Sequence, residues 1–67
     1  MTYHVHVYPN DEGGYTCIVR ALVNGSPEGP ALAIGTGRTQ GAARDAALMC
    51  TTNPNIRHLL RSYVPDE

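Results

Sequence analysis

The stretch GTGRTQGAARDAAL, residues 35–48, is the feature that most constrains how this chain can fold. Two glycines in alternate positions lead directly into an alanine-rich run, which predicts a strand that turns sharply into a helix. Thr39 suits the N-cap, because its hydroxyl can accept a hydrogen bond from an unpaired N–H of the first turn. We therefore predict a helix from about Gln40 to Thr51.

Small side chains define one face of this predicted helix and would let its axis lie close to a sheet. They are Ala42, Ala43, Ala46, Ala47 and Cys50. Gly35 and Gly37 have two interpretations: a phosphate grip at a helix N-terminus, or a tight corner between strand and helix. We favour the corner, because an isolated G-x-G is a weak motif and the chain has no lysine for a nucleotide-binding loop.

Three segments before this helix alternate in the manner of β-strands. They are residues 3–8, 15–23 and 31–36. The turn sequence PNDEGG, residues 9–14, joins the first two, and NGSPEGP, residues 24–30, predicts a second connection that is longer than a tight hairpin. Short connections between consecutive strands predict an antiparallel meander.

A second helix is predicted from Pro54 to about residue 63. Asn53 suits its N-cap, and proline is favoured at the first helical position. Apolar side chains recur at i, i+3, i+4 and i+7, which is the pattern of an amphipathic helix; they are Ile56, Leu59, Leu60 and Tyr63. Pro65 would end the helix. The order β-β-β-α-α predicts an α+β fold, with a three-stranded antiparallel sheet and both C-terminal helices on one of its faces.

Length and composition limit the class of protein. The chain of 67 residues is expected to form a single domain, 1–67, and one so small gains from self-association. No apolar run reaches the about 20 residues of a membrane span, and the start does not resemble a signal peptide. Cys17 and Cys50 do not form a CxxC pair, so we interpret both as reduced core thiols of a cytoplasmic or nuclear protein.

The charge composition argues against a protein that depends on phosphate contacts. The formal net charge is −1, and all five basic residues are arginines. Each neutralised phosphate adds affinity through counterion release, so nucleic-acid-binding proteins usually have a basic surplus. Any binding of nucleic acid by this chain must therefore depend on a few well-placed arginines.

The segment VNG at 23–25, followed by residues 35–48, resembles the C-terminal half of a double-stranded-RNA-binding domain (dsRBD). That family's pattern is roughly G-x-G-x-S-K-K-x-A-K-x-x-A-A. Matching or equivalent positions here are Gly35, Gly37, Thr39, Ala43, Arg44, Ala46 and Ala47. The resemblance covers about residues 3–50. It implies a dsRBD-like fold and contacts to double-stranded RNA.

The departures from the pattern fall in the regions through which that family contacts RNA. The family begins with a helix that reaches a minor groove, whereas this chain begins with a strand. Gln40 and Gly41 stand in place of two lysines, and the loop expected to enter the next minor groove contains Asp11 and Glu12. The three contact regions are therefore respectively missing, neutralised and reversed in charge.

The order β-β-β-α-α is a circular permutation of the family's α-β-β-β-α. The C-terminal helix, residues 54–63, can therefore occupy the place of the missing first helix, beside the helix at 40–51. The residues that would then contact RNA are Arg38, Thr39, Gln40, Arg44, Arg57, His58 and Arg61. If the two helices instead lie apart, these arginines are ordinary solvated side chains.

A weaker resemblance links GGYTC, followed by GRTQGAARDAA, to HicB-type antitoxins. That family shares a GG-aromatic strand and a G-x-T-x-x-E-A helix start. Gly41 stands where acidic character is expected, and the family's P-x-L-P-G segment is absent. We rank this resemblance below the first.

The sheet face opposite the helices is predicted to carry His4, His6, Tyr8, Ile18 and Leu22. An antiparallel sheet usually turns a polar face to water, so these apolar positions indicate a protein interface. Two histidines alone do not make a metal site, and no catalytic arrangement or cofactor motif stands out. The sequence thus predicts a non-enzymatic protein-interaction module that forms a homo-oligomer; the alternative is weak, sequence-independent binding of double-stranded RNA through arginines.

Overall fold

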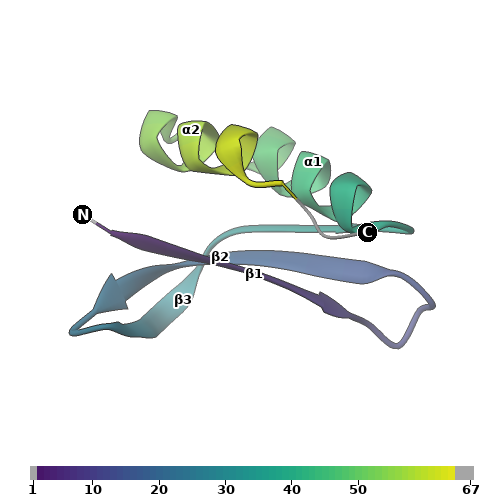
Figure 1. The fold of residues 1–67 in the computed structure, drawn as a ribbon, viewed down its shortest axis with the longest axis horizontal. Coiled ribbons are helices and arrows are strands. Elements are labelled where there is room, and N and C mark those ends of the chain that lie inside the picture. Colours follow the sequence, from purple (N-terminus) through teal and green to yellow (C-terminus); the bar gives the residue numbers. More distant parts are fainter. Residues whose placement is uncertain (1, 65–67) are drawn as a thin grey trace.

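The computed structural model describes residues 2–64 and has two layers (Figure 1). An antiparallel sheet of β1 (Tyr3–Pro9), β2 (Tyr15–Val23) and β3 (Ser26–Gly37) precedes α1 (Gln40–Cys50) and α2 (Pro54–Ser62), and the strands lie in the order β1-β2-β3. Both helices cover the same face of the sheet. The predicted α+β fold and its β-β-β-α-α order are confirmed, and the predicted stop at Pro65 lies outside the described residues.

The connection between β2 and β3 differs from the prediction. Asn24 and Gly25 form a tight two-residue turn with φ values of 52° and 83°, and Val23 pairs directly with Ser26. Positive φ at both central residues is the geometry of a type I′ hairpin, for which Asn-Gly is strongly preferred. The predicted long connection at residues 24–30 is therefore wrong, because most of that segment belongs to β3.

β3 contains two prolines because it is an edge strand. Pro27 lies opposite Leu22, and at an edge its missing N–H removes no bond that the sheet needs. The register then shifts: Val19 pairs with Ala33 while Ala21 pairs with Glu28, so residues 29–32 bulge opposite a single residue of β2. Gly29 has a φ of 79° within this bulge. The prolines and the bulge explain why the first half of β3 has the composition of a turn.

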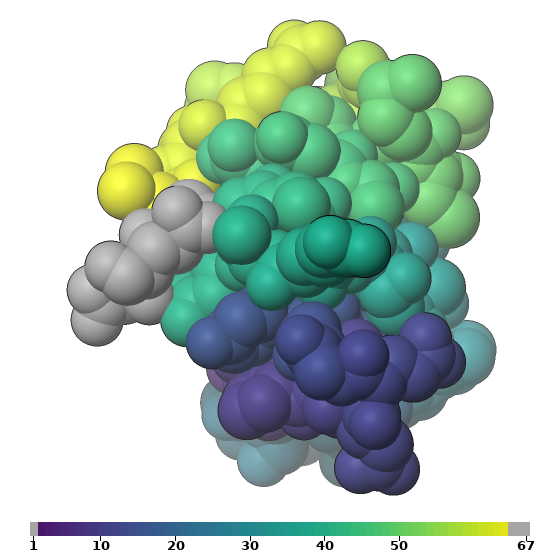
Figure 2. Space-filling model, turned by 90° about the vertical axis from the view of Figure 1, so that its right-hand side faces the viewer, coloured from purple at the N-terminus to yellow at the C-terminus, as the bar shows by residue number. Residues whose placement is uncertain are grey.

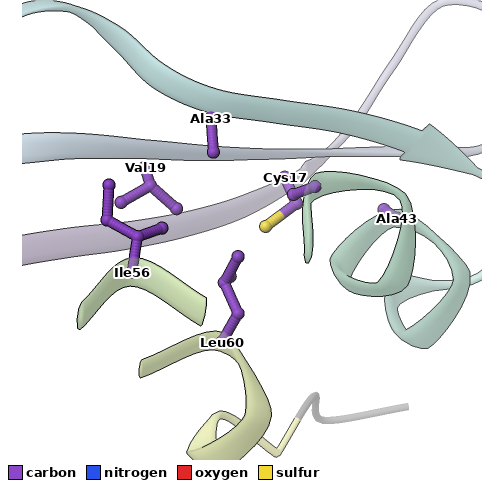
Figure 3. Close-up of a cluster of buried hydrophobic side chains, with 7 residues drawn as sticks. Cys17, Val19, Ala33, Ala43, Ile56 and Leu60 are labelled. Atoms are coloured by element: carbon purple, nitrogen blue, oxygen red, sulfur yellow. The ribbon is translucent and has the colours of Figure 1, made fainter. Parts of the chain in front are cut away.

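The hydrophobic core lies between the sheet and the two helices (Figure 3). Its fully buried members are Cys17, Val19, Ala33, Ala43, Ala47, Ile56 and Leu60. Leu60 and Ile56 bring α2 onto the same sheet that α1 covers, so α2 packs on its own chain. Alternate residues of β1 and β2, from Tyr3 to Val7 and from Tyr15 to Val19, complete the inner face as predicted.

α1 lies close to the sheet at Gly35, because this residue has no side chain. A Cβ atom built on Gly35 would stand 2.1 Å from the backbone N of Ala47 and 2.6 Å from the carbonyl O of Ala43. Ala43 and Ala47 are themselves fully buried. Gly35 therefore allows the strand and the helix to pack closely. This packing fits the interpretation of Gly35 as part of a tight corner between strand and helix.

The buried face of α1 is narrower than predicted. Cys50 is exposed, so its assignment to the core is wrong. Burial passes from Ala43 to Ala47 and then to Thr51, which is 7% exposed. These positions are four residues apart and lie on one side of a helix. Cys50 falls about 100° away from Thr51 around the axis, which turns its thiol to solvent.

Both predicted N-caps are present. The Thr39 hydroxyl accepts a hydrogen bond from the N–H of Ala42 at 3.0 Å. The Asn53 side chain accepts from the N–H of Asn55 at 2.9 Å, and Pro54 opens α2. These local signals fix where both helices begin.

Candidate functional site

The sheet has a second face that no helix of the described chain covers. We call it the outer face and define it by His4, His6, Tyr8, Ile18, Arg20, Leu22 and Ile34. Register places these residues together: His4 is opposite Arg20, His6 is opposite Ile18, and Ile18 is opposite Ile34. Directly opposed residues of an antiparallel pair project to the same side.

A row of aromatic rings runs along β1 on the outer face. The rings of His4 and His6 are 6.1 Å apart, and those of His6 and Tyr8 are 5.1 Å apart and tilted by 45°. These three side chains border a shallow hollow of about 180 Å³ together with Ile18, Arg20 and Pro27. Four of the five residues predicted for an interface thus meet around one hollow.

The apolar part of the outer face is larger than the sequence predicted. Ile34 is 49% exposed and lies opposite Ile18 on this face. Leu22 lies further along β2, opposite Pro27, and does not line the hollow. The alternation of Leu32, Ile34 and Thr36 was the signal that could have identified Ile34.

The RNA candidates at the start of α1 lie beside the β1–β2 loop, which occupies the lower part of the end view in Figure 2. Arg38 borders a second hollow of about 530 Å³, together with Glu12, Asn10 and the loop glycines. Asn10 organises this loop, since its side-chain oxygen accepts from the N–H groups of Glu12 and Gly14 at 3.0 and 3.1 Å. Arg38 therefore shares its surroundings with a carboxylate.

Thr39 and Gln40 contribute to the helix start. The Thr39 hydroxyl is already engaged by the N–H of Ala42. Gln40 is half-buried as the first residue of α1. Both residues thus form part of the turn from β3 into α1.

Arg44 and Arg57 each reach the C-terminal end of the other helix. Arg44 of α1 donates to the carbonyl oxygens of Tyr63 at 2.9 Å and Leu60 at 3.4 Å, where α2 ends. Arg57 of α2 donates to the carbonyl oxygens of Leu48 at 2.9 Å and Thr51 at 3.1 Å, where α1 ends.

The final carbonyls of a helix have no partners within it and carry partial negative charge. The two guanidinium groups of Arg44 and Arg57 satisfy carbonyls at both helix ends and fasten the helices together. Arg44 also donates from Nε to Asp45 Oδ1 at 2.8 Å. The remaining RNA candidates, His58 and Arg61, are exposed on α2.

The two thiols have different surroundings. Cys17 is fully buried, and desolvation raises its pKa above the ordinary value of 9.0, while the positive charge of Arg44 acts in the opposite direction. Cys50 is exposed. A neutral buried thiol is a poor nucleophile, so Cys17 acts as a packing residue.

Within residues 2–64, no group of three or more His, Cys, Asp or Glu side chains is placed to hold a metal ion. Neither helix of this described part is long and apolar enough to cross a membrane. Comparison with known proteins gave no matching family model, no similar curated protein and no similar solved structure. The role of the outer face must therefore be inferred from the geometry of this structure.

Proposed function

We propose that this protein is a non-catalytic interaction module that associates with copies of itself through the outer face. The observation that carries the proposal is the apolar pair of Ile34, which is 49% exposed, and the half-buried Ile18, which lies beside the aromatic row of β1. Two such faces can pack against each other as the two sheets of a β-sandwich do, about 10 Å apart.

The difference in burial between the two faces of the sheet supports this assignment. Every residue of the hydrophobic core lies on the inner side of the sheet or on the helices that cover it. On the outer side, the side chain of Ile34 is nearly half exposed. Burial of such side chains against another protein is favourable by about 25 cal/mol per Å² of apolar surface. A chain of this size gains stability from that burial.

The alternative, binding of double-stranded RNA, has less support. Arg44 and Arg57 hold helix ends within the molecule, and Arg38 borders the same hollow as Glu12. RNA binding through Arg44 and Arg57 would have to break those hydrogen bonds, and a phosphate near Arg38 would meet the negative charge of Glu12. Arg61 and His58 alone offer few of the phosphate contacts on which such affinity depends.

Sedimentation equilibrium over a range of protein concentrations tests the proposal. The native chain should associate, and Ile34→Lys should lower its average mass because a charge cannot be buried in the apolar contact without a partner. Ile18→Lys should act in the same direction. Met49→Lys is the matched control, because Met49 is 82% exposed on α1 and lies away from the outer face. Equal masses for the native chain and Ile34→Lys would refute the proposal.

A titration of an RNA duplex of about 20 base pairs, beside a DNA duplex, separates the alternative. Our proposal expects no binding of either duplex even at low salt. RNA-selective binding that weakens steeply as salt rises would instead support the arginine-based function.

A further inference from the structure

The two edges of the sheet differ in a way that points to a second contact between copies. β1 and β3 are the edge strands of the described sheet. β3 is interrupted by Pro27, Pro30 and the bulge at residues 29–32. Prolines and bulges are devices that prevent an edge from pairing with another strand. β1 has none of them before its last residue, Pro9, and it contains no Asp, Glu, Lys or Arg.

The hydrogen bonds at the two ends of the β1–β2 pair establish which backbone groups of β1 are unpaired. Leu22 donates its N–H to the carbonyl of Thr2 at 2.8 Å, and Asn10 donates to the carbonyl of Gly14 at 2.9 Å. In an antiparallel pair, hydrogen-bonded and non-hydrogen-bonded positions alternate. The even-numbered residues of β1 therefore bond to β2, and the odd-numbered ones turn their N–H and C=O groups to the free edge.

Pro9 agrees with this assignment. It is an odd-numbered residue opposite Tyr15, and the N–H that proline lacks would have pointed away from β2. The free edge thus presents the N–H and C=O groups of Tyr3, Val5 and Val7. These groups form an evenly spaced row that another strand can pair with.

We infer that β1 pairs antiparallel with β1 of a second copy, about a twofold axis at Val5. In this register Val5 meets the partner's Val5, and Tyr3 meets the partner's Val7, so all three donors and acceptors of each edge find partners. A shift by two residues toward Pro9 would place Tyr3 opposite Pro9, which has no N–H to donate. The Val5-centred register is the one that uses every free group.

The side chains of β1 suit the same twofold axis. The axis places His4 opposite the partner's His6, and the partner's His4 opposite His6, so like side chains face each other on the outer face. The two rings already lie side by side on their own strand, with centroids 6.1 Å apart. The result is a six-stranded sheet in which the two outer faces are continuous.

This contact rests on the proposed self-association but uses a different surface, so the two can be tested apart. Ile34 lies on β3, at the opposite edge from β1. The variant Ile34→Lys removes face-to-face packing and leaves the β1 edge intact. In that background the protein should still form dimers as its concentration is raised from micromolar to millimolar. A monomer throughout would overturn the inference, and a native chain that still associates would leave the proposed function standing.

Charge substitutions at the two histidines test the register. In the Ile34→Lys background, His4→Lys with His6→Lys places like charges opposite each other across the axis and should weaken dimerisation roughly tenfold. His4→Glu with His6→Lys places opposite charges there and should tighten it roughly tenfold. Both variants carry side chains that project from the monomer surface. Equal dimer affinities for the two variants would refute the register.

Amide hydrogen exchange provides a measurement without any change at the edge. In the monomer, the N–H groups of Tyr3, Val5 and Val7 should exchange quickly, while those of His4 and His6 are slowed by their bonds to β2. Protection of the odd-numbered amides should grow with protein concentration. A dimer in which these amides stay unprotected would overturn the inference, because the copies would then meet at another surface.

Discussion

The inner and outer faces of this sheet belong to the same three strands, but they differ in how closely the rest of the chain packs against them. On the inner face, the backbone of α1 lies against Gly35, and Ala43, Ala47 and Leu60 are fully buried. On the outer face, the side chain of Ile34 is 49% exposed, and its neighbour Ile18 borders a shallow hollow. The comparison teaches that the inner face determines whether the chain folds, while the outer face is available for association.

The largest expected effect is at Gly35, on the inner face. Gly35→Ala should destabilise the fold by about 4 kcal/mol or more, because the new Cβ would overlap the backbone of α1 and the helix would have to move off the sheet. Thr36→Ala is the matched control, since Thr36 is exposed on the same strand and should change stability by about 0.5 kcal/mol. Urea unfolding followed by circular dichroism measures both. A stable Gly35→Ala protein would show that α1 does not depend on this close approach.

A smaller difference is expected between two aliphatic truncations, one on each side of the sheet. Leu60→Ala should lower the free energy of unfolding by about 2–5 kcal/mol, because it leaves a cavity among Cys17, Val19 and Ile56. Ile34→Ala removes a half-exposed side chain and should cost about 1 kcal/mol or less in the monomer. Thermal unfolding at low concentration compares them. Similar losses for the two would mean that the outer face is also part of the core.

The paired arginines should have a more modest effect. Arg44→Met and Arg57→Met should each cost about 1–2 kcal/mol, because carbonyls at a helix end lose their donors while the aliphatic stem is kept. Arg61→Met is the control, since Arg61 is exposed on α2 and should change stability by less than about 0.5 kcal/mol. If all three variants behave alike in urea unfolding, the reciprocal capping contributes nothing measurable.

The features that the sequence predicted best are the helix starts, which depend on local chemistry. Thr39 and the pair Asn53-Pro54 marked the helix starts, because a cap depends only on residues a few positions away. The first half of β3 was missed, since Pro27 and its neighbours are tolerated only because β3 lies at the edge of the sheet. An edge position is a property of the whole sheet and cannot be read from one segment.

The candidate site was predictable to a similar extent. Alternation along β1 placed His4, His6 and Tyr8 on one side, and the rings do lie in a row there. Ile34 lay within the predicted strand 31–36, but the sequence analysis did not assign it to the outer face. The capping contacts of Arg44 and Arg57 were also missed, because each joins residues that only the packing of two helices brings together.

The smallest expected effect concerns the two thiols, which the sequence treated alike. Cys50, which is exposed, should react with Ellman's reagent rapidly in the native protein, and Cys17 only after unfolding. Burial raises the pKa of Cys17, so its neutral form is favoured in the folded state. The corresponding stability is fully present below the ordinary thiol pKa of 9.0 and is lost as the pH rises above it. Cys50→Ser should abolish the rapid reaction, and Cys17→Ser should retain it. The reason is that the α1 backbone and α2 shield the inner face, while Cys50 lies in water. The reverse outcome would mean that the helices open readily from the sheet.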